Sequence, residues 1–259
     1  MKTVILCGGY GTRIRDVNED IPKPMLTIGR LPILWHLMKY YSTFGHNDFV
    51  LCLGYKGQVI KDFFLNYQAH SKDFTINLGR PNEIEFHSSN DETSWKVTLV
   101  DTGQSAMTGS RVRQVREHLD NAPFFLTYGD GLSDVNLDSL LAFHKKHKKT
   151  VTVTGVRPPG RFGEMRATKD GLVSEFNEKP QASSGLISGG FFVCEQNVFD
   201  AMTDRDDLVF EQEPIQSLVA HQELAVFEHE GFWQCMDTPR DWQLLNTLLS
   251  TNQAPWKTW

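Results

Sequence analysis

The sequence predicts an α/β protein built on a mostly parallel, mixed sheet with helices on both faces. Three observations support this fold class. Apolar strand-like runs alternate with amphipathic helix-like runs through residues 1–155. The first strand-like run, residues 3–7, opens directly into a glycine-rich loop, and a later one, residues 124–128, ends in Gly129-Asp130-Gly131. Repeated strand–helix units form a largely parallel sheet whose carboxyl edge carries the functional loops.

The first elements follow from the spacing of their apolar residues. Residues 3–7 and 48–53 are short, continuous apolar runs, which are typical of buried strands. Residues 34–44 between them are expected to form a helix, because Pro32 suits a first helical turn. The apolar residues within 58–67 recur at helical spacing and predict a second helix.

The same criteria predict the elements up to residue 155. Residues 96–100 and 124–128 are further apolar strands, and residues 111–119 and 137–147 are expected to be helices. The run Val151-Thr152-Val153-Thr154 is β-branched throughout, which favours a strand.

The pattern changes after residue 155. Glycine and proline recur and the strand-like runs, at 172–176 and 191–193, are short. We expect a smaller, mixed-sheet part that packs against the first half, within one continuous domain spanning residues 1–259. The polar and poorly periodic residues 67–94 fit an excursion, a mobile lid or an oligomer contact.

Composition excludes several classes of protein. The chain has 259 residues, of which 40% are hydrophobic and 22% charged, as in ordinary globular proteins. Its formal net charge of −6 argues against a general nucleic-acid-binding protein. We expect neither a signal peptide nor a membrane span. The four cysteines are scattered without zinc-site spacing, and Cys7 and Cys52 lie in apolar runs. These features predict a reduced, cytoplasmic protein.

The glycine-rich loop after the first strand predicts a polyanion site. Gly8-Gly9-Tyr10-Gly11-Thr12-Arg13 can bring backbone N–H groups to one point, because glycine tolerates positive φ and has no side chain. Arg13 and Lys23 add positive charge, so the phosphates of a nucleotide are the expected ligand. The alternative is a tight β-turn with a surface arginine.

Two common nucleotide motifs do not fit this loop. A P-loop requires a Lys-Ser or Lys-Thr pair at a fixed spacing after its glycines, and none is present here. A dinucleotide fingerprint requires a third glycine where Ile14 stands.

Two carboxylates predict a metal site near the phosphates. Asp130 follows the strand at 124–128 and would repel phosphates unless a cation lay between them. Mg²⁺ suits this position, since one or two carboxylates plus substrate phosphates bind it. Asp237 lies in an otherwise apolar run, where a charge is costly unless it is paired or metal-bound. The alternatives are a turn aspartate for Asp130 and a helix N-cap before residues 238–249 for Asp237.

Signals for a second substrate are weaker. Glu178-Lys179-Pro180 follows the strand-like run at 172–176, so a proline-fixed turn would project Lys179. Residues 157–163 form a stiff basic loop that could clamp an anionic acceptor or make a structural corner. No nucleophile motif of the G-x-S-x-G type is present. Direct transfer between phosphates needs none, only positioning and charge neutralisation.

Taken together, these segments resemble the sugar-phosphate nucleotidylyltransferases, and within them the cytidylyltransferases that act on glucose 1-phosphate. The family signature is a G-G-x-G-T-R loop followed by a P-K-P-M-like segment, and the similarity runs nearly end to end. The further matching segments are 32–36, 54–57, 98–103, 107–109, 128–131, 158–163, 189–192, 211–214, 236–238 and 254–257.

The resemblance implies a Rossmann-like fold of the nucleotide-diphospho-sugar transferase type and a role for each matching residue. Residues of about 1–155 would form a nucleotide-binding half, and about 156–259 an acceptor-binding and oligomerisation half. Catalytic roles fall to Arg13, Lys23 and Asp130, and Mg²⁺ would be held by Asp130 and Asp237. The implied nucleotide-binding residues are Leu6, Cys7, Gly8, Gly9, Gly11, Thr12, Arg13, Lys23, Arg111 and Gly129. The implied acceptor-binding residues are Glu178, Lys179, Ser188 and Gly189.

The implied reaction transfers CMP from CTP to α-D-glucose 1-phosphate, giving CDP-glucose and pyrophosphate for deoxysugar and surface polysaccharide synthesis. The resemblance also implies a homo-oligomer, with a hexamer as one form. Three positions depart from the family pattern: Ser188 replaces asparagine, residues 164–166 replace a smaller and more apolar run, and Ile21 replaces a basic residue. The first two motivate an alternative, a cytidylyltransferase with another phosphorylated acceptor. A catalytically inactive binding subunit is the third hypothesis, although Lys23, Asp130, Lys179 and Asp237 are all present.

Overall fold

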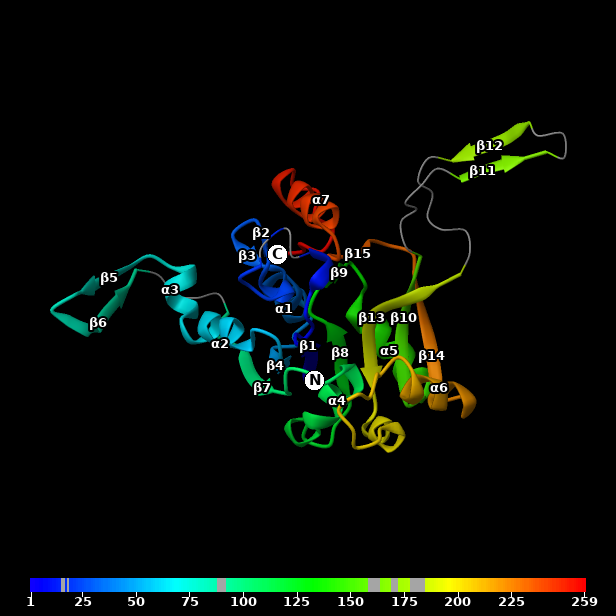
Figure 1. The fold of residues 1–259 in the computed structure, drawn as a ribbon, viewed down its shortest axis with the longest axis horizontal. Helices are drawn as coiled ribbons and strands as arrows, with labels where there is room; N and C mark the ends of the chain where they lie inside the picture. The colour runs from blue at the N-terminus through cyan, green and yellow to red at the C-terminus, as the bar shows by residue number, and fades with distance from the viewer. Residues whose placement is uncertain (15–16, 18, 88–91, 158–163, 169–171, 178–184) are drawn as a thin grey trace.

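The computed structural model describes residues 1–14, 17, 19–87, 92–157, 164–168, 172–177 and 185–259 of the chain. Its centre is a sheet with the strand order β14-β10-β13-β8-β1-β4-β7 (Figure 1). Every neighbouring pair is parallel except the two that involve β13, which runs antiparallel to β8 and β10. The strands are β1 (Thr3–Leu6), β4 (Asp48–Leu53), β7 (Lys96–Asp101), β8 (Phe124–Tyr128), β10 (Val151–Val156), β13 (Ile187–Cys194) and β14 (Leu224–His229). The predicted fold class is therefore confirmed.

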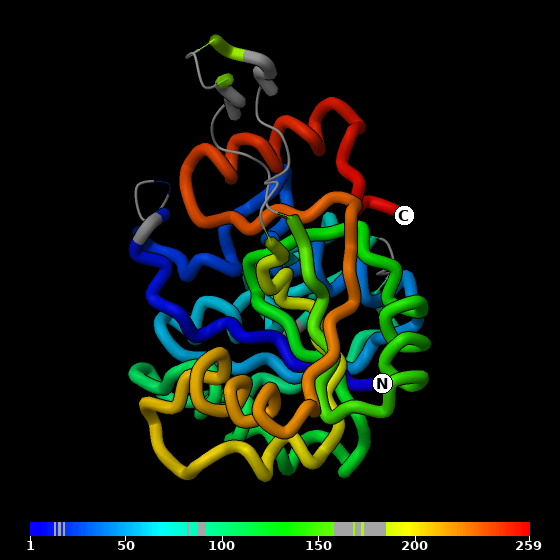
Figure 2. Tube along the Cα trace, turned by 90° about the vertical axis from the view of Figure 1, so that its right-hand side faces the viewer, coloured from blue at the N-terminus to red at the C-terminus, as the bar shows by residue number. Residues whose placement is uncertain are grey.

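Each face of the sheet packs against its own helices, because alternate strand residues point to opposite sides. On one face, Ile5 and Leu51 pack with α1 (Ile33–Thr43), α2 (Gly57–Leu65) and α5 (Leu137–His147). On the other, Val4 and Val50 pack with α4 (Thr108–Gln114) and α6 (Glu213–Ala220). Figure 2 shows α5 and α6 on opposite sides of the sheet.

The carboxyl-terminal region closes over the first of these faces. Helix α7 (Pro239–Ser250) follows the short strand β15 (Trp233–Cys235), which pairs with β9 (Gly131–Ser133). Trp256, near the end of the chain, is fully buried in the core beside α1.

Several elements lie outside the central sheet. Helix α3 (Tyr67–Ser71) leads into the hairpin of β5 (Phe74–Asn77) and β6 (Arg80–Phe86), which projects from the body of the molecule (Figure 1). The remaining pairs are β2 (Thr27–Ile28) with β3 (Leu31–Pro32), and β11 (Glu164–Ala167) with β12 (Val173–Asn177). Short 3₁₀ helices are η1 (Thr12–Ile14), η2 (Lys23–Met25), η3 (Arg116–His118) and η4 (Gln196–Ala201).

Three predicted helices have different bounds in the structure. The helix expected at 34–44 is shifted by one residue, to Ile33–Thr43. The helix expected at 111–119 begins three residues earlier, at Thr108, and ends at Gln114. The helix expected at 58–67 ends at Leu65. None of the helices in the described part of the chain combines the length and apolar character that crossing a bilayer requires. The division into a nucleotide half and an acceptor half stays a prediction.

Candidate active site

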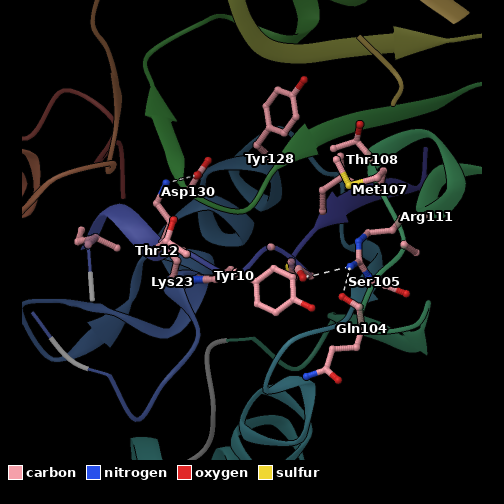
Figure 3. A pocket seen from close by; sticks show the side chains of 18 of the residues that line it. Tyr10, Thr12, Lys23, Gln104, Ser105, Met107, Thr108, Arg111, Tyr128 and Asp130 are labelled. Atoms are coloured by element: carbon pink, nitrogen blue, oxygen red, sulfur yellow. Dashed lines mark hydrogen bonds and ion pairs between the residues drawn. The ribbon is translucent and has the colours of Figure 1, made fainter. Parts of the chain in front are cut away.

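A cavity of about 380 Å³ lies at the carboxyl edge of β1 and β8 (Figure 3). One wall is the glycine-rich loop after β1, and the opposite wall is the segment 104–108 that leads into α4. The lining residues are Leu6, Cys7, Gly8, Gly9, Tyr10, Gly11, Thr12, Ile14, Lys23, Pro24, Gln104, Ser105, Ala106, Met107, Thr108, Arg111, Tyr128, Asp130 and Asp237. The structure therefore brings most of the predicted nucleotide and metal residues to one cavity.

The three glycines of the loop serve different purposes. Gly11 has a φ of +57°, a conformation that side chains disfavour. Gly8 is buried, and a Cβ atom there would lie 2.2 Å from Cζ of Arg111. Gly9 is exposed, and a Cβ atom there would meet nothing within 4 Å. Of these three glycines, only Gly9 is required neither by packing nor by a positive φ. Its exposed backbone is therefore open to a ligand.

Lys23 lies between the two predicted metal carboxylates. Its Nζ donates to Oδ2 of Asp130 at 2.5 Å and also to Oδ1 of Asp237. The lysine side chain is 11% exposed, against 28% for Asp130 and 19% for Asp237. Burial alone lowers the pKa of the Lys23 ammonium, but the two carboxylates together outweigh it and hold the pKa above its ordinary value. Lys23 is therefore a fixed positive charge at neutral pH.

Distant parts of the chain bring Asp237 to this point. The pairing of β15 with β9 places Cys235 opposite Gly131, and the Met236 amide donates to the Asp130 carbonyl at 2.8 Å. The helix N-cap is Thr238, which forms a capping box with Asp241. The alternative interpretation of Asp237 as the N-cap is therefore wrong, and its carboxylate faces Lys23 instead.

Asp130 and Asp237 fit a Mg²⁺ site. Their oxygens come from separate elements and converge on one ammonium nitrogen, so both carboxylates present negative charge to the same place. Carboxylate oxygens are the hard ligands that Mg²⁺ prefers, and the remaining positions are commonly filled by water and phosphate oxygens. In the described part of the chain, no group of three or more His, Cys, Asp or Glu side chains is arranged for a metal. An ion here would take its further ligands from water and from a bound substrate.

Arg111 lies beneath the loop and is 4% exposed. Its Nη1 donates to the Leu53 carbonyl (2.8 Å), Thr102 Oγ1 (2.6 Å) and the Gly103 carbonyl (2.8 Å), and its Nη2 donates to the Gly8 carbonyl (3.1 Å). These acceptors are uncharged, and burial lowers the pKa of the guanidinium. Arg111 thus connects the carboxyl end of β4 with the loops that follow β1 and β7.

The other predicted residues lie around this cavity or outside the described residues. Gly129 packs under the loop, where its amide donates to the Leu6 carbonyl at 3.0 Å. Arg13 is part of η1. Ser188 and Gly189 lie on β13, and Ser188 lines a separate cavity of about 260 Å³. Glu178 and Lys179, together with residues 158–163 of the basic loop, lie outside the described residues.

Cys7 and Cys52 are buried, as their apolar surroundings predicted. Desolvation is the main cause that raises the pKa of both thiols. They remain protonated at neutral pH and have the character of small apolar side chains.

Sequence reasoning missed one wall of the cavity and the residue that supports it. Tyr128 and Thr108 both line the cavity and both donate to the Glu211 carboxylate, Thr108 Oγ1 at 2.6 Å. Burial and then the Glu211 charge raise the pKa of the Tyr128 hydroxyl. Tyr10 also lines the cavity, with its ring 5.1 Å from that of Tyr55. Tyr10 belongs to the glycine loop, and Thr108, Tyr128 and Glu211 lie in segments that match the family pattern, but none of the four was assigned a role.

The fold and this cavity define an α/β protein with a candidate ligand site at the carboxyl edge of its sheet. The family model described as "Nucleotidyl transferase" matches residues 2–243. The chain therefore belongs to the nucleotidyl transferase family and is a nucleotidyltransferase enzyme. This confirms the resemblance on which the predicted reaction type depends.

Individual relatives agree with this assignment. The chain is 48% identical to the glucose-1-phosphate cytidylyltransferase of Salmonella typhimurium over 260 aligned residues, which cover 100% of both chains. It is 40% identical to the probable glucose-1-phosphate cytidylyltransferase of Bacillus subtilis, again over 100% of both. The crystal structure of HddC from Yersinia pseudotuberculosis shares the fold, with a TM-score of 0.69 at 20% identity, covering 96% of this chain and 99% of that one.

Proposed function

We propose that this enzyme transfers CMP from CTP to α-D-glucose 1-phosphate, giving CDP-glucose and pyrophosphate. The observation that carries this proposal is the Lys23 ammonium held by Asp130 and Asp237 at the wall of the glycine-loop cavity. The full-length identity to glucose-1-phosphate cytidylyltransferases supports both substrates.

The triphosphate lies along the glycine loop in this proposal. Gly9 and Gly11 offer backbone N–H groups to its oxygens, while Thr12 and Arg13 lie at the outer end of the loop. Lys23 neutralises the α-phosphate and the oxygen that bridges it to the leaving group. One such positioned group contributes roughly 10²–10³ in turnover.

The reaction needs no protein nucleophile. A phosphate oxygen of the sugar 1-phosphate attacks the α-phosphorus of CTP, one P–O bond forms, and the bond to the α–β bridging oxygen breaks. The attacking oxygen is already anionic at neutral pH, so no proton has to be removed. Mg²⁺ bound by Asp130 and Asp237 would supply charge neutralisation for the phosphates. The protein positions the two reactants in line and excludes competing water.

The acceptor side of the proposal uses Lys179 for the sugar phosphate, with Glu178, Ser188 and Gly189 for the sugar. Ser188 and the charged residue Glu164 differ from the family pattern. These two residues are the observation that favours the second candidate function, transfer of CMP to a different phosphorylated acceptor.

The family resemblance also supports the wider setting of this function. We propose a cytoplasmic homo-oligomer that supplies CDP-glucose for deoxysugar and polysaccharide synthesis. This part of the proposal depends on the likeness to the relatives and not on the geometry of the cavity.

Pyrophosphate release by the purified chain with Mg²⁺ tests both candidate functions. CTP, UTP, dTTP and GTP are each paired with glucose 1-phosphate, and CTP is then paired with a panel of sugar phosphates and small phosphorylated metabolites. We expect the highest kcat/KM for CTP with glucose 1-phosphate. Release with another acceptor and none with glucose 1-phosphate would establish the second candidate. If none of the acceptors supported pyrophosphate release, both candidate functions would be contradicted.

A further inference from the structure

Tyr10 is a partly exposed aromatic residue within the glycine-rich loop. It is 47% exposed and lines the cavity of about 380 Å³. Figure 3 shows its ring reaching into the cavity, with Lys23 on one side and Ser105 on the other. The glycines that flank Tyr10 offer backbone groups to a ligand, whereas Tyr10 offers a flat and largely apolar surface. The binding of phosphates and of a metal, as described above, makes no use of that surface.

The ring of Tyr10 is supported by the segment that follows β4. Its centroid lies 5.1 Å from that of the Tyr55 ring, at an interplanar angle of 42°. The Lys56 ammonium lies over the Tyr55 ring, 5.4 Å from its centroid, and donates to the Glu19 carbonyl. The Tyr55 amide also donates to the Gly8 carbonyl at 3.3 Å. Because these contacts position the ring before any ligand binds, a ligand that packs against it loses less free energy to ordering.

The cavity has a charged side and an uncharged side. Lys23 lies with the carboxylates of Asp130 and Asp237 at the first of these. The opposite wall, residues 104–108, consists of Gln, Ser, Ala, Met and Thr, which carry no charge. Arg111 is the other cation among the described lining residues, but it is 4% exposed and its guanidinium already donates to oxygens of the protein. Phosphates therefore belong on the Lys23 side, and the space along residues 104–108 suits an uncharged polar group.

We propose that Tyr10 stacks on the nucleobase of the donor nucleotide. One face of the base lies on the Tyr10 ring, and the edge of the base points toward residues 104–108. The Gln104 amide and the Ser105 hydroxyl belong to exposed residues, and each can donate and accept hydrogen bonds at that edge. The stacking rests on the proposed use of CTP as donor. It adds a binding residue at the position that the family signature, G-G-x-G-T-R, leaves open.

Stacking on Tyr10 supplies affinity and not chemistry. Every base has an aromatic face, so the ring strengthens the binding of any nucleotide and leaves the choice among bases to the polar groups of residues 104–108. The base is separated from the α-phosphorus by the ribose, and its contact with Tyr10 is the same before and during the transfer. Loss of the ring should therefore raise KM for CTP and leave kcat nearly unchanged.

Binding of CTP and of ribose 5-triphosphate by the full-length protein tests this role. Calorimetry measures both affinities with Mg²⁺ and without an acceptor. The second ligand has the ribose and the triphosphate of a nucleotide but no base. We expect Tyr10→Ala to weaken CTP binding roughly 5- to 150-fold, as for the loss of one stacked base, and to leave the affinity for ribose 5-triphosphate within about twofold.

Three further variants separate the aromatic face from other effects. Tyr10→Phe keeps that face and should bind CTP as the wild type does. Phe74→Ala removes an aromatic side chain that is 39% exposed on β5 and does not line the cavity, and it should also leave CTP binding unchanged. Circular dichroism shows whether each variant is folded. Tyr10→Leu, which keeps an apolar contact for Tyr55 without an aromatic face, decides the matter if Tyr10→Ala is not folded.

The possible failures are distinguishable from one another. If Tyr10→Ala binds CTP as tightly as a wild type that releases pyrophosphate, the stacking is overturned and the proposed function stands. Equal losses for CTP and ribose 5-triphosphate would mean that Tyr10 acts through the phosphate loop, which also overturns the stacking. A wild type that binds no CTP would contradict the proposed function and the stacking together.

Discussion

Lys23 is the residue on which the chemistry of the site depends. Its ammonium contacts two carboxylates that are 107 and 214 residues away in the sequence. Two carboxylates at such close quarters repel each other unless a cation lies between them. The same lysine therefore stabilises the site and supplies the positive charge for the α-phosphate.

Replacing Lys23 by alanine should lower kcat by about 10²–10³-fold, because one charge-stabilising group for the transition state is lost. Steady-state pyrophosphate release with CTP and glucose 1-phosphate measures the effect. Lys2→Ala is the control, since Lys2 pairs with Asp120 at 2.8 Å and does not line the cavity. Near-normal turnover of the Lys23 variant would contradict its catalytic role.

His36 makes stability depend on pH. It is 4% exposed, its Nε2 lies 2.9 Å from the Ile28 carbonyl, and burial lowers its pKa from 6.5 to about 4, with a smaller contribution from Lys257. Between pH 6.5 and about pH 4, His36 binds a proton in the unfolded chain but not in the folded chain. Stability should therefore fall across this range as the pH is lowered, by about 3 kcal/mol from this group.

Urea denaturation at a series of pH values measures that contribution. His36→Gln keeps an N–H donor for the Ile28 carbonyl but does not titrate, so its stability should fall less steeply between pH 6.5 and 4. Parallel stability profiles for the two proteins would show that His36 does not cause the dependence.

At the scale of elements, the conformation of the glycine loop depends on the buried side chain of Arg111. The guanidinium occupies the space where a side chain at Gly8 would be, and a Cβ atom on Gly54 would lie 2.6 Å from its Nη1. Two glycines at the ends of neighbouring strands thus make room for one buried arginine. Gly8 and Gly9 are adjacent in the sequence but face different constraints.

Gly8→Ala should destabilise the protein by about 1–3 kcal/mol, because the added methyl group overpacks against Arg111. Gly9→Ala is the matched variant and should change stability by less than about 0.5 kcal/mol, as at an unconstrained surface position. Chemical denaturation of both proteins measures the difference. Equal free energies of unfolding for the two variants would mean that Arg111 makes room for the added methyl group without loss of stability.

The elements that the sequence predicted best are those with a strong hydrophobic pattern, either a continuous apolar run or helical spacing. The strands at 48–53 and 124–128 and the helix at 137–147 have the predicted bounds. The hairpin of β5 and β6 was missed, because its short alternating runs have no core of their own chain to cover. Of the site, the glycine loop, Lys23, Asp130 and Asp237 were predictable, since local pattern marks them. Glu211 was not, because it reaches Thr108 and Tyr128 only through the tertiary fold.

At the scale of the whole molecule, the site is assembled from both ends of the chain. The loop after β1, the end of β8 and the turn after β15 meet at the cavity. The family model likewise runs from residue 2 to residue 243, and a fragment that ends before Asp237 would lack one of the three parts.

Removal of divalent ions should abolish turnover but leave the fold nearly unchanged. Asp130 and Asp237 remain neutralised by Lys23, so their mutual repulsion does not develop when metal is withdrawn. Pyrophosphate release and thermal unfolding, each with EDTA and then with excess Mg²⁺, separate the two effects. Full turnover in EDTA would exclude the proposed metal role, and a large loss of thermal stability would indicate a structural metal.

The buried Arg111 has a consequence for redesign of the enzyme. Because one guanidinium holds the carbonyls of Gly8, Leu53 and Gly103, the phosphate loop and the segment that begins the opposite wall move as a single rigid piece. Substitutions in residues 102–104 that are meant to change base selectivity will therefore also shift the backbone that receives the triphosphate. Engineers who wish to alter one property without the other should vary the side chains of residues 105–108, which line the cavity but give the Arg111 guanidinium no hydrogen-bond acceptor.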